Sequence, residues 1–252
     1  MKEIFMTDKG KVRQHNEDSG AIVFNKSGQR LAIVADGMGG HRAGDVASRL
    51  TVEKLTDLWI ENEAIMTADE AESWLQTNIL QVNQFVLQYA LTHPECEGMG
   101  TTIIAVISTE NFSTIAHVGD SRCYLYNEDG FKQMTEDHSL VNELVRMGQI
   151  SKEDAEHHPR KNVVLRALGT DENLVIDIIT IMFEQGDVML ICSDGLSNKV
   201  TDDQLIEVLK QDNSLETKAA TLIHTANENG GEDNITVVIL EYFTGNQAGE
   251  EQ

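Results

Sequence analysis

The strongest constraint on the fold of this chain is that three short apolar runs each adjoin an aspartate. Two of the runs, residues 31–35 and 188–192, are followed within two residues by an Asp-Gly pair, and the third begins directly after an Asp-Asn pair. The three aspartates are Asp36, Asp194 and Asp233. Short apolar runs bounded by turn residues predict buried strands. We therefore expect three carboxylates at strand ends, an arrangement that suits one hard-cation site assembled from distant parts of the chain.

A single Asp-Gly pair is more often an ordinary turn than a metal ligand. The three aspartates together, with Gly37, Gly39 and Gly40 beside the first, favour a site for Mg²⁺ or Mn²⁺ that backbone and side chains both approach. A water that bridges two such ions is a nucleophile at neutral pH. Rival phosphate chemistries lack their motifs, since the sequence has no Cys followed six positions later by Arg, no Asp-x-Asp and no GxxxxGK[ST].

The formal net charge of −23 argues against nucleic acid or an anionic membrane as a partner, because the chain has no basic surplus. The charge fits cation binding, although a solubilising surface explains it equally well. Cys96, Cys123 and Cys192 show no CxxC spacing, which favours a reduced compartment. No apolar run approaches the ~20 residues of a membrane span. We therefore expect a cytoplasmic monomer without membrane insertion.

We expect one domain over residues 1–244 and a disordered tail over 245–252, because no linker-like stretch interrupts the chain. Residues 1–18 are predicted to be irregular. Strands cluster in the middle and at both ends, and helices come in pairs, so the pattern is not a strict β-α-β alternation. It predicts an α+β fold with mostly antiparallel strands. Two sheets packed face to face, with a helix pair on each outer side, would form a four-layer αββα sandwich.

Several elements have specific signals. Residues 43–60 and a stripe at 75, 79, 82, 86 and 89 predict two amphipathic helices. Residues 101–109 and 112–118 predict paired strands, and Asn127–Gly130 predicts a hairpin turn. Thr201 and Gln204 have the spacing of a helix capping box.

Seven segments in order along the chain resemble the motifs of the metal-dependent type 2C protein phosphatases, especially the single-domain bacterial serine/threonine phosphatases. The segments are residues 13–18, 36–41, 98–102, 119–122, 135–139, 193–195 and 231–234. One of them alone would be weak evidence, but seven in family order cover essentially the whole chain. The resemblance implies a β-sandwich between helix pairs and a dinuclear Mn²⁺ or Mg²⁺ centre.

The resemblance also implies a metal-binding role for particular residues. Asp36 bridges both metals and the Gly37 carbonyl binds the first, whereas Asp194 and Asp233 bind the second. Asp120 corresponds to a ligand for a third, weaker ion that it shares with Asp194. The alternative for Asp120 is a simple turn cap, because aspartate is a favoured turn residue.

Around the metals, the resemblance implies that Glu17 and Asp18 hold metal-bound waters. Arg13 corresponds to the residue that grips the substrate phosphate, a role suited to a planar guanidinium. A surface salt bridge is the alternative for Arg13. Residues 139–165 correspond to a variable flap beside the site.

The general acid is not identified by the sequence. Some relatives place a histidine where Met38 stands, and a methionine cannot donate a proton. We expect metal-bound water to serve as the acid, with His41 as a second candidate. The adjacent His157 and His158 are expected to be solvated, because metal ligands need convergent geometry.

These observations predict a protein serine/threonine phosphatase that hydrolyses phosphoserine and phosphothreonine by attack of a metal-bridging water, without a phosphoenzyme. By resemblance, its partner class is a bacterial serine/threonine kinase and the substrates of that kinase. Two alternatives stay open: a catalytically silent scaffold of the same fold, and a dedicated phosphatase of one regulatory partner.

Overall fold

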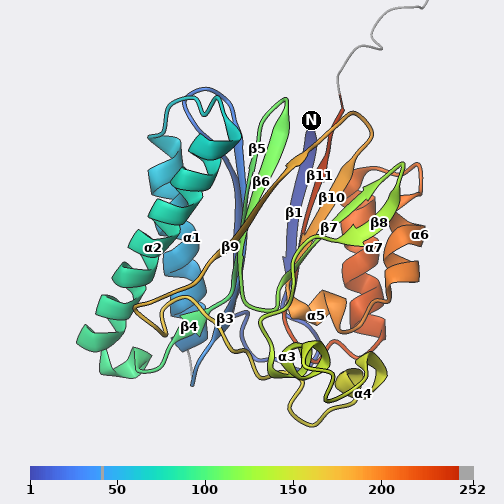
Figure 1. Ribbon diagram of the computed structural model, residues 1–252. Helices are drawn as coiled ribbons and strands as arrows, with labels where there is room; N and C mark the ends of the chain where they lie inside the picture. The colour runs from blue at the N-terminus through green and yellow to red at the C-terminus, as the bar shows by residue number, and fades with distance from the viewer. Residues whose placement is uncertain (41–42, 244–252) are drawn as a thin grey trace, which may run out of the picture.

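The computed structural model describes residues 1–40 and 43–243, which form four layers (Figure 1). Two β-sheets pack face to face, and a pair of helices covers the outer side of each sheet. The predicted α+β fold with αββα layers is therefore confirmed. His41 and the tail predicted over 245–252 lie outside the described residues, and the single domain over 1–244 stays a prediction.

The first sheet has the strand order β1-β11-β10-β7-β8, and all of its pairings are antiparallel. Its strands are β1 (Lys2–Asp8), β7 (Arg122–Asn127), β8 (Gly130–Gln133), β10 (Val188–Cys192) and β11 (Ile235–Glu241). The central strands β10 and β11 are buried on both faces, which explains their continuous apolar sequences. The predicted hairpin joins β7 to β8.

The second sheet has the order β2-β3-β5-β6-β9, with β4 paired to the end of β3, and its pairings are also antiparallel. Its strands are β2 (Asp18–Phe24), β3 (Arg30–Met38), β4 (Gly100–Thr101), β5 (Ile103–Ser108), β6 (Phe112–Val118) and β9 (Asp177–Met182). The strand predicted over 101–109 is thus divided in two. Because β4 pairs with Gly37 and Met38, β3 continues past the predicted end at Ala35.

Two helix pairs cover the outer faces. They are α1 (Ala43–Ile60) with α2 (Ala68–Thr92) on the second sheet, and α6 (Asp202–Leu209) with α7 (Leu215–Glu228) on the first. The predicted stripe of α2 faces inward, since Leu75, Ile79, Val82 and Val86 are buried. The predicted capping box of α6 is present: Gln204 N–H donates to Thr201 Oγ1, and Thr201 N–H donates to Gln204 Oε1.

Three separate apolar cores lie between the four layers. Neighbouring residues of one strand feed different cores, as in β10, where Leu190 faces the helices and Ile191 faces the other sheet. This follows from the two-residue repeat of a strand, which points successive side chains to opposite faces.

The prediction that residues 1–18 are irregular is wrong for the first part of this segment. Lys2–Asp8 forms the edge strand β1, which pairs with β11 along its whole length. Ile4 and Met6 pack on the helix-side core, and Phe5 packs between the sheets. Charged residues at both ends of this short run hide its alternation, and only the edge of β11 supplies a partner for it.

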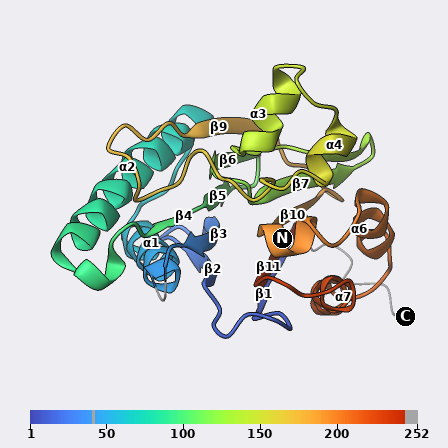
Figure 2. The same cartoon turned by 90° about the horizontal axis from the view of Figure 1, so that it is seen from below.

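The segment from 139 to 165 contains α3 (Leu140–Arg146) and α4 (Lys152–Glu156) and lies at one end of the sandwich (Figures 1 and 2). The short helix α5 (Asp194–Ser197) lies at the same end. Two backbone bonds close the base of the segment: Leu140 N–H donates to the Val163 carbonyl at 2.8 Å, and Leu165 N–H donates to the His138 carbonyl at 2.7 Å. The role of this segment as a flap stays a prediction.

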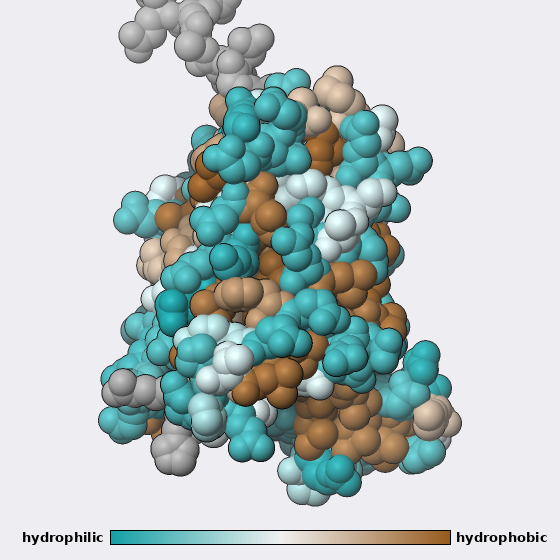
Figure 3. All heavy atoms as spheres, turned by 90° about the vertical axis from the view of Figure 1, so that its left-hand side faces the viewer, coloured by the Kyte–Doolittle hydropathy of each residue, from teal (hydrophilic) through white to brown (hydrophobic). Residues whose placement is uncertain are grey.

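The surface on the α1 and α2 side is a mixture of polar and apolar residues without one dominant sign of hydropathy (Figure 3). Within residues 1–40 and 43–243, no helix has the length and apolar character needed to cross a membrane. Cys96, Cys123 and Cys192 are buried and free.

Leu190→Ala should reduce the free energy of unfolding by about 2–5 kcal/mol, because it leaves a cavity beneath α6 and α7. Urea denaturation would measure the loss. Val175→Ala is the control, because Val175 is 59% exposed, and its effect should stay within about 0.5 kcal/mol. Equal losses in both variants would contradict the core assigned to β10.

Candidate functional site

Asp36 lies inside β3, two residues before the last residue of this strand. Its backbone is held by the neighbouring threonines: Asp36 N–H donates to Thr102 Oγ1 at 2.9 Å, and the Asp36 carbonyl accepts from Thr101 Oγ1 at 2.9 Å. The prediction that Asp36 follows the end of its strand is wrong, because the ladder continues on both sides of it. The carboxylate is consequently fixed by a sheet and not by a turn.

Asp18 stands directly opposite Asp36 on the neighbouring strand β2. Side chains at directly opposed positions of an antiparallel pair lie close together. Asp18 is only 7% exposed, and its Oδ2 accepts a hydrogen bond from Ser193 Oγ at 2.7 Å. Ser193 comes from the other sheet, so this bond joins the two sheets at the site.

The two remaining predicted aspartates come from the first sheet. Asp194 opens α5 directly after β10, and its Oδ2 accepts from Asn198 Nδ2 at 3.0 Å. Asp233 stands two residues before β11, and its Oδ1 accepts from the Asn234 N–H at 2.9 Å. Asp36 and Asp194 are close enough to share a hydrogen bond. The structure thus brings together three carboxylates that are distant in the sequence.

Arg13 brings a cationic group to this cluster. Among the described residues, it is the one lysine or arginine that forms an ion pair with Asp18, Asp36, Asp194 or Asp233. Its Nη2 lies 2.8 Å from Asp233 Oδ2, and its Nη1 lies 3.6 Å from Glu17 Oε2. The side chain of Arg13 is 46% exposed, so the guanidinium still faces solvent on one side. The salt bridge considered in the sequence is therefore present, and its partner is a predicted metal ligand.

Asn234 belongs to the motif at residues 231–234, but no role is predicted for it from the sequence. Its Nδ2 donates to the carbonyls of Lys9 and His15, and its Oδ1 accepts from the Glu17 N–H. One amide side chain therefore ties the loop between β1 and β2 to the start of β11. Buried polar side chains are usually hydrogen-bonded. The position of Asn234 next to the predicted metal ligand Asp233 was therefore the one sequence signal that could have indicated its structural role.

Gly37 lies where α1 begins to pack against β3. A Cβ atom on Gly37 would lie 2.1 Å from the Gly44 carbonyl oxygen and 2.6 Å from the Glu17 carbonyl oxygen. No side chain fits there, so the glycine is required by close backbone approach and not by backbone conformation. The expected use of the Gly37 carbonyl as a metal ligand stays a prediction.

Burial and mutual repulsion make the carboxylate cluster costly to ionise. Burial raises the pKa of Asp36 well above its ordinary value, and the charges of the neighbouring aspartates raise it further. The same causes, with burial first, raise the pKa of Asp18 to about 7 and that of Asp194 to about 6. A set of buried oxygen donors that repel one another fits hard divalent cations such as Mg²⁺ or Mn²⁺.

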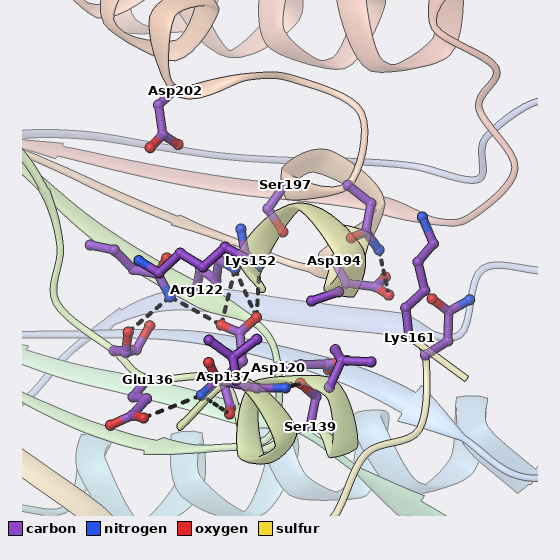
Figure 4. Close-up of a pocket in the computed structure, with 18 of the residues that line it drawn as sticks. Asp120, Arg122, Glu136, Asp137, Ser139, Lys152, Lys161, Asp194, Ser197 and Asp202 are labelled. Carbon is purple, nitrogen blue, oxygen red and sulfur yellow. Dashed lines mark hydrogen bonds and ion pairs between the residues drawn. The ribbon is translucent and has the colours of Figure 1, made fainter. Parts of the chain in front are cut away.

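A cavity of about 1050 Å³ opens beside the cluster, between α3, α4 and the segment from α5 to α6 (Figure 4). Asp120 and Asp194 both line it. Burial is the main cause that raises the pKa of Asp120 to about 7, and the Asp194 charge is the next. The two carboxylates are therefore close enough to interact, as expected for residues that would share an ion.

Of the three histidines considered from the sequence, the structure describes His157 and His158. His157 is exposed and lines the cavity, whereas His158 Nδ1 accepts from the Arg160 N–H at 3.1 Å, so the two do not converge on one point. His41 lies outside the described residues, so its candidacy as an acid stays a prediction.

Comparisons with known proteins agree with this arrangement. A family model described as Protein phosphatase 2C matches residues 9–236. The serine/threonine phosphatase stp of Listeria innocua is 51% identical over 237 residues, which is 94% of this chain and 94% of the relative.

Solved structures give the same result. The serine/threonine phosphatase Stp1 from Staphylococcus aureus has a TM-score of 0.91 at 36% identity, over 96% of this chain and 95% of that one. The catalytic domain of the serine/threonine phosphatase PstP, in complex with two manganese ions, has a TM-score of 0.82 at 34% identity, over 94% and 96%.

The stabilisation of this protein by Mn²⁺ should grow from about pH 5 to about pH 8. Asp18 and Asp194 have raised pKa values in the folded state, so folding with protonated carboxyls is favoured at low pH. Without a cation, this stability should be lost as the pH rises from about 4, the ordinary pKa of an unfolded aspartate, to about 6–7, and bound Mn²⁺ should prevent the loss. Calorimetric melting temperatures in Mn²⁺ and in chelator measure the difference.

The comparison of two cation conditions has an internal control. Burial lowers the pKa of His117 to about 4, so this residue destabilises the fold as the pH falls below about 6.5. That effect is common to both conditions and cancels in the difference. A stabilisation by Mn²⁺ that does not vary with pH would contradict the raised pKa values of the cluster.

Proposed function

The chain belongs to the protein phosphatase 2C family, and we propose that its carboxylate cluster is the catalytic centre of this metal-dependent protein serine/threonine phosphatase. One observation carries the assignment: Asp36, Asp194 and Asp233 come from three distant segments and converge in a single buried cluster. The substrates of the enzyme are phosphoproteins. Two closely placed cations would offset the repulsion that the cluster otherwise imposes on the fold.

We infer that the carboxylates of Asp36, Asp194 and Asp233, together with the Gly37 carbonyl, would hold two Mn²⁺ or Mg²⁺ ions. The two manganese ions of the related PstP catalytic domain support this number. When bound, such a pair polarises the phosphoryl oxygens and makes a water nucleophilic at neutral pH.

The protein's own groups hold and orient the reactants. Arg13 projects its guanidinium beside Asp233 and toward solvent, where it can grip the incoming phosphate with two parallel N–H bonds. Glu17 and Asp18 accept hydrogen bonds from waters at the centre and fix their orientation. Met38 has no proton to give, so the leaving alkoxide takes its proton from water in the cavity.

A third, weaker cation is proposed between Asp120 and Asp194. Both carboxylates line the cavity, and Asp120 makes no side-chain hydrogen bond to another described residue that would occupy its oxygens. Two protein ligands leave most positions of the ion to water, which explains weak binding. An ion held there would orient water near the leaving group.

The physiological setting follows from the family and from the charge. We propose that a bacterial serine/threonine kinase and the phosphoproteins it produces are the partners, and that the enzyme acts as a cytoplasmic monomer. The strongly acidic surface is unsuited to nucleic acid.

Hydrolysis of a phosphothreonine peptide should stop in excess chelator and return when Mn²⁺ or Mg²⁺ is added. The reason is that the proposed nucleophile is a water, which is reactive at neutral pH only when cations activate it. Release of inorganic phosphate measures the reaction. Full turnover in excess chelator would rule out the mechanism, and loss of hydrolysis with intact Mn²⁺ binding would favour a silent scaffold.

Arg13→Ala should raise KM for the same peptide by about ten- to a hundredfold, the loss expected for one charge-assisted phosphate contact of about 1.5–3 kcal/mol. Mn²⁺ affinity should not fall, because Arg13 pairs with Asp233 and competes with a cation for its oxygen. Steady-state kinetics and calorimetry measure the two quantities.

Lys11→Ala is the matched control for Arg13, because Lys11 lies on the same loop and pairs with Glu228 at 2.8 Å, away from the carboxylate cluster. Its KM should be unchanged. If Arg13→Ala leaves KM unchanged and lowers only the melting temperature, the salt bridge is its whole role.

A further inference from the structure

Two histidines hold the backbone of Gly119, the residue that precedes Asp120. The Gly119 carbonyl accepts from the His138 N–H and from His117 Nε2, both at 2.8 Å. The Gly119 N–H donates to His138 Nδ1 at 3.1 Å. A Cβ on Gly119, whose φ is +114°, would lie 2.5 Å from Thr102, so the backbone has no room to shift on that side.

The partners of His138 define its tautomer. Nδ1 accepts a hydrogen bond from the Gly119 N–H, so Nε2 must carry the proton of the neutral ring. Nε2 accordingly donates to Asp177 Oδ2 at 3.1 Å. Asp177 is held in turn by Arg166, whose Nη1 lies 3.1 Å from Oδ1. Burial lowers the pKa of His138, which agrees with the neutral form.

These side chains are not arranged as a metal site, although ligand atoms of His117, His138 and Asp177 lie within 4.8 Å of one another. A cation at His138 Nε2 would displace the proton that the Gly119 bond assigns to this atom. It would also face the Arg166 guanidinium, which lies 3.3 Å away. The group is therefore a hydrogen-bonded chain that runs from Asp177 through His138 to Gly119.

We propose that His138 is a positioning residue for Asp120 and thereby sets the affinity for the weaker cation, an inference that rests on the proposed third-ion site. The peptide unit that follows the Gly119 carbonyl is planar and carries the Asp120 nitrogen. Fixing the Gly119 N–H and carbonyl therefore fixes the position of the Asp120 nitrogen and limits the directions in which the Asp120 side chain can leave the backbone.

Such support is needed because Asp120 and Asp194 repel each other when both are ionised. A loop that was free to rotate would turn Asp120 away and lose the second ligand. The bond from the Gly119 N–H to His138 Nδ1 supplies this support from outside the acidic cluster. His138 thus acts through the backbone and does not touch the reacting atoms.

Two substitutions of His138 test the hydrogen bonds of its two ring nitrogens separately. His138→Asn keeps an acceptor at the position of Nδ1 but loses the bond to Asp177. His138→Gln keeps a donor near the position of Nε2 but leaves the Gly119 N–H without its acceptor. Both lose one bond of the ring, so a purely structural role predicts the same behaviour from both.

Calorimetric titration with Mn²⁺ and amide exchange at Gly119 by NMR in chelator are the measurements. In His138→Gln the weaker Mn²⁺ binding should fall by about two- to tenfold, the effect of one lost hydrogen bond, and the Gly119 amide should exchange faster. His138→Asn should resemble the wild type in both. His158→Gln is the control, because its Nδ1 bonds only within the 158–160 turn among the described contacts.

Asp120→Asn separates this proposal from the function on which it rests. Loss of the weaker Mn²⁺ binding in Asp120→Asn, together with the expected split between the His138 variants, supports both. Loss in Asp120→Asn with equal behaviour of the two His138 variants overturns the positioning role alone. If the weaker Mn²⁺ binding event is still present in Asp120→Asn, the third-ion site and this proposal are both overturned.

Discussion

The repulsion between buried carboxylates is the interaction on which the site of this phosphatase depends. Asp18 and Asp36 face each other across two strands of one sheet, and Asp194 and Asp233 approach from the other sheet. Burial raises the pKa of Asp18, Asp36 and Asp194, and the charges of neighbouring carboxylates raise it further. Bound divalent cations would offset this repulsion, which agrees with the divalent-metal dependence that the family and a manganese-bound relative support.

A rigid frame must hold the carboxylates together until the cations arrive. The frame is made of hydrogen bonds to side chains: Thr102 fixes the Asp36 backbone, Asn234 fixes the loop that carries Glu17, and Ser193 joins the two sheets through Asp18. Apolar packing alone would not orient the carboxylate oxygens, because the hydrophobic effect is non-directional. Directional hydrogen bonds supply this precision.

Arg13 adds a cationic group to this frame. In the structure its guanidinium pairs with Asp233 and remains half exposed, and it offsets part of the acidic charge. In the proposed function, a cation on Asp233 would take over this neutralisation and would leave the guanidinium available to a phosphate. Metal occupancy and the binding of substrate would then be coupled through this shared carboxylate.

The sequence alone determined the antiparallel α+β architecture, the helix pairs and the identity of the aspartates, because apolar periodicity and Asp-Gly pairs are local signals. It did not reveal β1, since a short edge strand with charged ends is recognised only when β11 pairs with it. It also could not show that Asp36 lies inside a strand, that Asn234 clamps three backbone groups, or that His138 holds Gly119. These facts depend on contacts between residues far apart in the chain, and only the tertiary structure decides them.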